Sequence, residues 1–208
     1  MDEECLLNLL ASEDTRDLIL DDEALLKAVL EQPCWLKISS HLYFYILVRQ
    51  VFLRSGIGDR SVADYVAEML SEYSREEQTR CVIRGEEKPL IYFVDMLAAL
   101  QEADERTSFE IRAHMGNYSL FMTGVFPDRV RWRTERKGAP GLSYYENMGR
   151  SSFRVARDHA LARRFNLDSV FDVLSERFGV TRRALNQLSE TLVSLGDPDC
   201  SAGLKQFE

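Results

Sequence analysis

The chain of 208 residues carries 26 Lys and Arg against 34 Asp and Glu, and 45% of its residues are hydrophobic. That hydrophobic content excludes an intrinsically disordered chain, and the length suffices for one large domain or two small ones. The uncharged stretches of the chain, residues 38–48 among them, are too short for a membrane-spanning helix, which requires about 20 apolar residues. The acidic residues 1–5 are unlike a secretory signal peptide. We therefore expect a cytoplasmic protein with no membrane partner.

The cysteines and short motifs indicate no cofactor and no catalytic centre. The four cysteines are scattered, without the close Cys-x-x-Cys grouping that a zinc site or a redox pair requires. The chain has no phosphate-binding loop, dinucleotide-binding glycine motif, nucleophile elbow or His-Glu-x-x-His motif. We expect free thiols, no metal, no cofactor, no catalytic residue and no enzymatic activity.

The charge is divided unevenly along the chain. Residues 1–128 hold 12 basic and 24 acidic side chains, whereas residues 129–208 hold 14 basic and 10 acidic ones. Within residues 129–164 the ratio is 10 basic to 3 acidic. This division is typical of a nucleic-acid-binding segment joined to another module. Alternatively, arginine-rich helix faces pair with the acidic half of the same molecule.

Residues 1–126 are predicted to form a series of helices. The pattern of residues 42–48 is apolar or aromatic on every side, which is typical of a central helix. A polar connector is expected over residues 74–88. The spacing of apolar residues predicts helices over residues 2–10, 16–32, 41–54, 59–73, 90–100 and 105–125.

Residues 127–141 interrupt the helical pattern with two prolines and two glycines. Within them Val130, Trp132 and Thr134 alternate with charged residues, which indicates a connector or a short strand. Helices are expected again over residues 142–165, 168–178 and 181–195, before a frayed tail. The prediction is an all-α multi-helical bundle of eight or nine helices. An acidic helical core (1–126) and a basic helical region (142–208) flank the connector, unless the two pack as one domain.

Residues 167–192 have the layout of a helical hairpin with a glycine corner. Apolar residues recur at helical spacing on both sides of Gly179, which would supply the positive φ of the turn. Ser175, four residues earlier, is small enough to face a second helix, and long polar side chains follow the corner. Over this segment the chain resembles the helix-turn-helix superfamily of DNA-binding proteins.

The resemblance implies roles for matching positions only. Thr181 and Arg182 would contact phosphate, and Arg183, Asn186 and Gln187 would read base edges. The preceding helix would place Arg163 and Arg164 near the nucleic-acid backbone. A structural hairpin within a bundle explains the same pattern, and acidic residues on both helices oppose a DNA-facing surface.

The three histidines suggest a second kind of site. Each lies at helical spacing from a polar or aromatic residue, so the group could converge on a small ligand in the bundle core. Satisfied core or boundary histidines are the alternative, and the paired Glu-x-x-His motifs of di-iron bundles are absent. The candidate ligand-pocket residues are His41, Tyr45, Glu110, His114, Tyr118, Tyr145 and His159.

Small residues within two predicted helices indicate close helix packing. Glycine inside a helix costs about 1 kcal/mol relative to alanine, so a compensating contact is expected. Close approach of the helices over 105–125 and 142–165 is the preferred explanation, and room for a ligand is the rival one. The residues concerned are Ala113, Gly116, Gly124, Gly149, Ser152 and Ala156.

Asp95 lies between Val94 and Met96 in a helix that is otherwise apolar. A buried carboxylate requires an arginine or hydrogen-bond donors. We expect an ion pair of Asp95 with Arg49 or Arg112.

The sequence thus favours a helical binding or interaction protein without catalytic activity, in which residues 168–195 belong to the core. The alternative is a helix-turn-helix regulator that binds nucleic acid through its basic C-terminal region. A ligand- or metal-binding helical protein or enzyme is the third hypothesis. The expected partners are accordingly a nucleic acid, another protein or a second copy of the chain. Exposure of Arg182 and Arg183 distinguishes the first two hypotheses.

Overall fold

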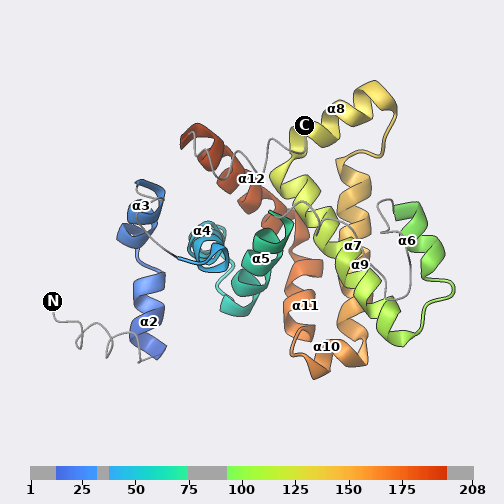
Figure 1. Ribbon diagram of the computed structural model, residues 1–208, viewed down its shortest axis with the longest axis horizontal. Helices are drawn as coiled ribbons and strands as arrows, with labels where there is room; N and C mark the ends of the chain where they lie inside the picture. Colours follow the sequence, from blue (N-terminus) through green and yellow to red (C-terminus); the bar gives the residue numbers. More distant parts are fainter. Residues whose placement is uncertain (1–12, 32–37, 75–92, 196–208) are drawn as a thin grey trace.

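A computed structural model describes residues 13–31, 38–74 and 93–195, and over these residues the protein consists of helices without any strand (Figure 1). The all-α prediction is therefore confirmed. None of the described helices combines the length and the apolar character needed to cross a membrane. The predicted helix over residues 2–10, most of the polar connector and the tail lie outside the described residues.

The described residues contain eleven helices, more than the eight or nine expected. Two predicted helices are each broken in two, at Asp21–Asp22 and at His159, and a further helix lies within residues 127–141. The bounds are α2 Glu13–Leu20, α3 Glu23–Glu31, α4 Ser40–Arg54, α5 Arg60–Tyr73, α6 Phe93–Ala99, α7 Glu105–Val125, α8 Pro127–Lys137, α9 Leu142–Asp158, α10 Ala160–Arg164, α11 Asp168–Glu176 and α12 Phe178–Leu195.

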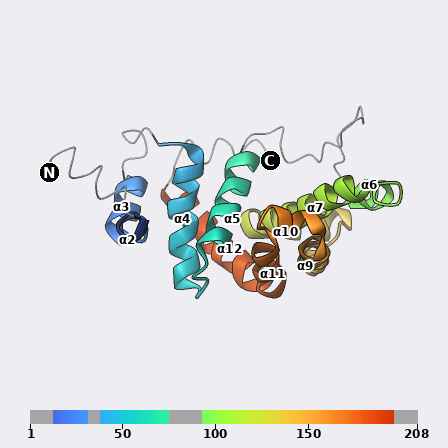
Figure 2. The same cartoon turned by 90° about the horizontal axis from the view of Figure 1, so that it is seen from below.

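Helix α4 lies inside the fold, as its apolar pattern predicts. The Ser39 hydroxyl accepts a hydrogen bond from the Leu42 N–H (3.2 Å) and caps the helix start. The helix ends before Gly56, whose φ of 73° suits a residue without a Cβ atom. Helix α5 packs beside α4, and α12 packs against α4 from elsewhere in the chain (Figures 1 and 2).

Helix α7 packs closely against α9, as the small residues predict. A Cβ atom on Gly116 would lie 2.6 Å from the Phe153 ring, and one on Gly149 would lie 2.7 Å from the Cβ of Ser119. Gly124 instead faces α12, where its Cβ would meet Leu185 at 2.9 Å. The glycines therefore allow α7 to approach two neighbouring helices closely.

The two halves of the sequence interleave in space. Helix α11 packs against α5 and α9, and α12 packs against α4, α7 and α9. The buried residues form one cluster, with large side chains contributed by α4, α7, α9, α11 and α12. The acidic first half and the basic second half thus share a hydrophobic core.

The prediction of a connector or strand over residues 127–141 is wrong, because most of it forms α8. Pro127 occupies the first turn, where a missing N–H breaks no helical hydrogen bond. The helix ends at Gly138, which adopts a left-handed conformation (φ 62°). Val130 is the one buried residue of α8, and the helix extends away from the end of α7 (Figure 1).

The predicted ion pair of Asp95 with Arg49 or Arg112 is also wrong, because Asp95 is exposed on α6. Arg49 is 4% exposed and instead donates to both carboxylate oxygens of Asp21, at 2.8 and 3.1 Å. Arg60 donates to the same carboxylate at 2.6 Å. The Gln50 side chain donates to the Asp21 carbonyl at 2.7 Å. This cluster attaches the α2–α3 pair to α4 and α5.

Candidate nucleic-acid interface

The corner between α11 and α12 differs from the predicted glycine turn. Helix α11 ends at Glu176, and α12 begins at Phe178, so that Gly179 lies in the first turn of α12. The glycines with positive φ in the described residues are Gly56 and Gly138, so the expected positive φ of Gly179 is wrong. A Cβ atom on Gly179 would lie 3.1 Å from Glu146 Oε1, so the Glu146 side chain on α9 leaves little room beside this glycine.

Thr181 and Arg182, expected to contact phosphate, both point into the fold. Thr181 is fully buried, and its hydroxyl donates to the Arg177 carbonyl at 3.1 Å. The Arg182 side chain is 18% exposed, and its Nε lies 3.5 Å from Glu146 Oε2. The Thr181 hydroxyl is therefore bonded to the backbone at the corner that precedes α12. The Arg182 guanidinium joins α12 to α9.

Asn186, expected to read a base edge, connects α12 to the end of α7. Its amide donates to the carbonyls of Thr123 and Gly124, at 2.9 and 2.6 Å. Its side-chain oxygen accepts a hydrogen bond from Arg182 Nη1 at 3.2 Å. These bonds satisfy carbonyl groups near the α7 C-terminus, so Asn186 stabilises the packing of α12 on α7.

The remaining four nucleic-acid candidates are exposed. Arg183 and Gln187 lie on α12, and Arg163 and Arg164 lie on α10. Helix α11 separates the two pairs (Figure 1). The structure therefore does not gather the seven predicted residues into one surface.

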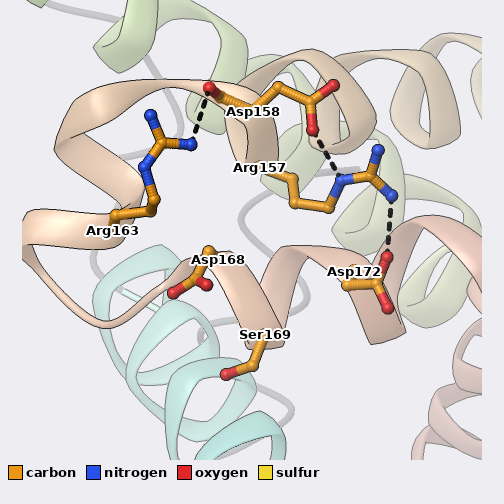
Figure 3. Close-up of a pocket in the computed structure, with 6 residues that line it drawn as sticks. All are labelled: Arg157, Asp158, Arg163, Asp168, Ser169 and Asp172. Atoms are coloured by element: carbon orange, nitrogen blue, oxygen red, sulfur yellow. Dashed lines mark hydrogen bonds and ion pairs between the residues drawn. The ribbon is translucent and has the colours of Figure 1, made fainter.

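An open pocket of about 330 Å³ lies beside Arg163, where α9, α10 and α11 meet (Figure 3). The Arg157 guanidinium bridges two carboxylates across it, donating to Asp158 at 2.9 Å and to Asp172 at 2.7 Å. Arg163 donates to the Asp158 carbonyl at 3.3 Å. The lining residues are Arg157, Asp158, Arg163, Asp168, Ser169 and Asp172.

The charges of this pocket oppose a phosphate ligand. The lining holds three carboxylates and two guanidinium groups. Hydrogen bonds to Asp158 and then Asp172 raise the pKa of Arg157, and the bond from Arg157 lowers the pKa of Asp158. Arg157 is thus already neutralised by its neighbours, and a polyanion would meet the surrounding carboxylates.

Two of the three histidines of the predicted ligand pocket have separate local roles. His41 is partly exposed, with its Nε2 3.1 Å from Asp64 Oδ1 and 3.6 Å from Glu68 Oε2. His159 Nδ1 accepts the Leu161 N–H at 3.1 Å and caps α10. Neither arrangement provides a shared ligand-binding centre.

The third histidine, His114, lies in an aromatic cluster. Its Nδ1 is 3.1 Å from the Tyr73 hydroxyl, and its ring stacks on Tyr118 with centroids 6.3 Å apart. Tyr118 in turn lies 6.4 Å from Tyr145, and Phe93 contacts both tyrosine rings. Burial lowers the pKa of His114 to about 4, so the imidazole is neutral at pH 7. The structure brings together three predicted pocket residues, His114, Tyr118 and Tyr145, as packed rings.

The remaining two pocket candidates also have nearby partners. The Tyr45 hydroxyl accepts a bond from Arg60 Nη1 at 3.4 Å, and Glu110 accepts one from Arg106 at 2.9 Å. Across residues 13–31, 38–74 and 93–195, no group of three or more His, Cys, Asp or Glu side chains is arranged to hold a metal ion. The seven residues of the predicted pocket thus lie in several different environments.

Helix α8 carries a surface that the residue-by-residue prediction missed. Arg129, Trp132, Arg133 and Arg136 follow the spacing i, i+3, i+4 and i+7, which places them on one side of a helix. Trp132 is 51% exposed and lies at one edge of this group, where Asp128 and Glu135 are its neighbours at i−4 and i+3. The Lys137 ammonium lies 5.3 Å from the centre of the Trp132 ring, within the range of a cation–π contact. We call these five residues the α8 face.

Several arginines of the basic region are paired with carboxylates, and the cations of the α8 face are not among them. Arg154 pairs with Glu176 at 3.2 Å, and Arg157 pairs with two aspartates. Arg129, Arg133, Arg136 and Lys137 form no ion pair with any residue that the structure describes. Among the residues that the structure describes, no carboxylate neutralises these four cations.

The sequence holds a signal for this surface. The excess of basic residues over 129–164 is visible, and four of its cations are those of the α8 face. Two prolines and two glycines in residues 127–141 indicate a connector, and that interpretation conceals the helical spacing of the arginines. Recognition of Pro127 as a first-turn proline reveals that spacing.

Comparison with known proteins identifies no relative: no family model, no curated protein and no solved structure matches the chain.

Proposed function

We propose that this protein binds nucleic acid through the α8 face. The observation that carries the proposal is an exposed tryptophan next to four cations that have no acidic partner in the described part of the chain. Phosphate groups that bind such cations release condensed counterions, which supplies most of the affinity of sequence-independent binding. Aromatic rings among the cations provide a stacking surface for bases.

The proposal moves the contact surface from the second helix of the helix-turn-helix-like hairpin to α8. Arg182 and Asn186 bind protein groups, whereas the arginines of the α8 face form no ion pair with the residues that the structure describes. It keeps the expectation that the basic C-terminal region contacts nucleic acid. It also keeps a cytoplasmic location and a non-catalytic role.

The test is the salt dependence of oligonucleotide binding, measured by fluorescence anisotropy. If the four cations neutralise four phosphates, affinity should fall about 50- to 150-fold between about 50 and 200 mM salt. The variant R129A/R133A/R136A should remove most of the binding at about 50 mM salt and should flatten the salt dependence, because three phosphate contacts are lost.

The matched control is R106A/R131A/R154A, which removes the same number of positive charges. Each of its arginines pairs with a carboxylate, respectively Glu110, Asp128 and Glu176. Exposed pairs of this kind contribute about 0–1 kcal/mol each, so the control should remain folded. Equal loss of affinity in both variants, or no binding of the wild-type protein to any oligonucleotide at about 50 mM salt, would refute the proposal.

A further inference from the structure

We infer that the cations of the α8 face also bind an acidic surface on α6 of a second copy of this chain, so that copies associate through unlike surfaces. The two surfaces are complementary in charge, and the one on α6 contains apolar area that stays exposed in a single copy. Association of copies then competes with nucleic acid for the same cations. The competition rests on the proposed function, whereas the contact between copies does not.

The outer side of α6 is apolar and exposed. Phe93 and Met96 are buried and attach this helix to the core. Val94 is 73% exposed, and Leu97 is 36% exposed. Ala98, which is also exposed, lies four residues after Val94 on the same side of the helix. Neighbouring apolar side chains on one exposed side are typical of an interaction surface.

Carboxylates border this apolar area. Asp95 is exposed on α6, and Glu102 and Glu105 are exposed in the turn after α6 and in the first turn of α7. These three carboxylates form no ion pair with any residue that the structure describes. The adjacent Arg106 is already paired with Glu110 at 2.9 Å. We call the following residues the α6 patch: Val94, Asp95, Leu97, Ala98, Glu102 and Glu105.

Helix α8 has the opposite charge. Residues 127–137 hold five basic and two acidic side chains, a net charge of +3, so the helix as a whole attracts a carboxylate surface. Four of its cations follow the spacing i, i+4, i+7 and i+8 and lie next to one another along the helix: Arg129, Arg133, Arg136 and Lys137. Unpaired cations on α8 thus correspond to unpaired carboxylates on the α6 patch.

Arginine side chains suit both parts of the α6 patch. The aliphatic stem of an arginine covers apolar area, while its guanidinium group pairs with a carboxylate at the border. The contact would remove Val94 and Leu97 from solvent and would give the carboxylates a partner. A cation that is paired in this way is not available to a phosphate group. Association of copies therefore lowers the affinity for nucleic acid.

Both surfaces are held in place near the start of α9. The centre of the Phe93 ring on α6 lies 5.4 Å from that of the Tyr145 ring on α9. The Thr134 hydroxyl of α8 lies 3.2 Å from the Pro140 carbonyl, which shortly precedes α9. Because the surfaces belong to different helices, a pair of copies that makes one such contact keeps one free surface of each kind. Association then continues beyond a pair or closes into a ring.

Analytical ultracentrifugation at about 50 mM salt tests the contact. The average mass of the wild type should rise above that of a single chain as its concentration increases. D95K/E102K and R129E/R133E/R136E should each weaken the association about tenfold or more, because each places like charges opposite one another. The control D64K/E190K reverses two exposed carboxylates on α5 and α12 and should associate at least as strongly as the wild type.

A mixture of the two weakened variants separates a lost contact from a misfolded chain. The α6 patch of R129E/R133E/R136E is still acidic, and α8 of D95K/E102K is still basic. An equal mixture should therefore associate although neither variant does so alone.

Oligonucleotide anisotropy distinguishes this contact from the proposed function. D95K/E102K should bind an oligonucleotide at least as tightly as the wild type, and the oligonucleotide should dissociate the wild-type assemblies. A wild type that stays a single chain, a mixture that does not associate, or unchanged association of D95K/E102K overturns the inference and leaves the proposed function intact. Association of copies without oligonucleotide binding refutes the proposed function and the competition, and leaves the contact between copies standing.

Discussion

Replacing Asp21 by asparagine is expected to destabilise the protein by about 3 kcal/mol and to release α2 and α3 from the rest of the fold. The substitution removes the carboxylate that Arg49 and Arg60 share, and it leaves the buried Arg49 guanidinium without its charge partner. Urea unfolding measures the loss of stability. Hydrogen exchange measures the release, because amide groups of α2 and α3 should lose protection before those of α4.

The control for this change is D95N. Asp95 is exposed on α6 and forms no ion pair with the described residues, so removal of its charge should alter stability by less than about 0.5 kcal/mol. Equal free energies of unfolding for D21N and D95N would contradict a structural role for the cluster of Asp21, Arg49 and Arg60.

The ion pairs of Asp21 with Arg49 and Arg60 also make the free energy of unfolding depend on pH. The hydrogen bond from Arg49 is the main cause that lowers the pKa of Asp21 below 3.8, and Arg60 adds to it. Because the folded pKa is lower than the unfolded one, this stabilisation is fully present above about pH 4 and is lost as the pH falls through the folded pKa. The difference in unfolding free energy between wild type and D21N should therefore shrink below about pH 4.

Replacing Gly149 by alanine is expected to cost about 2 kcal/mol, although alanine is the better helix former. The new Cβ would lie 2.5 Å from the ring of Phe178 and 2.7 Å from the Cβ of Ser119, and both side chains are fully buried. Overpacking of a core contact costs about 1–3 kcal/mol or more, which exceeds the gain of about 1 kcal/mol in helix propensity. Thermal and urea unfolding measure the difference.

Two further variants separate overpacking from a general effect of alanine. G58A serves as the control, because a Cβ on Gly58 would meet no atom within 4 Å. Shortening Phe178 in the double variant G149A/F178L should restore part of the stability, since the two positions are in contact. A stability of G149A equal to that of the wild type would show that α7, α9 and α12 can separate without loss.

The parts of the fold that follow from local sequence were predictable. Ser39 and Asp59 cap α4 and α5, and the apolar pattern of α4 corresponds to its place inside the bundle. The small residues Gly116 and Gly149 indicated the close packing of α7 and α9. A helix cap depends on residues that are close in the sequence. Close packing of two helices depends on the size of the side chains between them.

The partner of a buried charge was not predictable in the same way. Asp95 lies among apolar residues in the sequence, as a buried carboxylate would. The carboxylate that binds the buried Arg49 is nevertheless that of Asp21, because the break between α2 and α3 brings Asp21 next to Arg49. A choice between two carboxylates depends on tertiary contacts that no local pattern contains.

The candidate site shows the same limit. Arg182 and Asn186 have the residue types of a base-reading helix, but the side of α12 that carries them packs on α7 and α9. Conversely, the prolines and glycines around Trp132 predict a connector. Two of them are in fact the first-turn proline and the terminal glycine of α8, because these residue types occur at helix ends as well as in loops. Whether such a side chain packs in the core or is free to bind a partner depends on its exposure. That exposure is set by how the helices assemble.

The distance between α8 and the acidic α2–α3 pair, which lie on opposite sides of the molecule in Figure 1, has a kinetic consequence. The chain as a whole has a net charge of −8, so a distant polyanion is repelled, whereas the proposed binding surface on α8 would attract it at close range. The Debye length is about 8 Å at physiological ionic strength and about 30 Å at 0.01 M. If α8 binds nucleic acid as proposed, moderate salt would screen the acidic α2–α3 pair from a nucleic acid that approaches α8, and the encounter would become selective for one orientation of the protein.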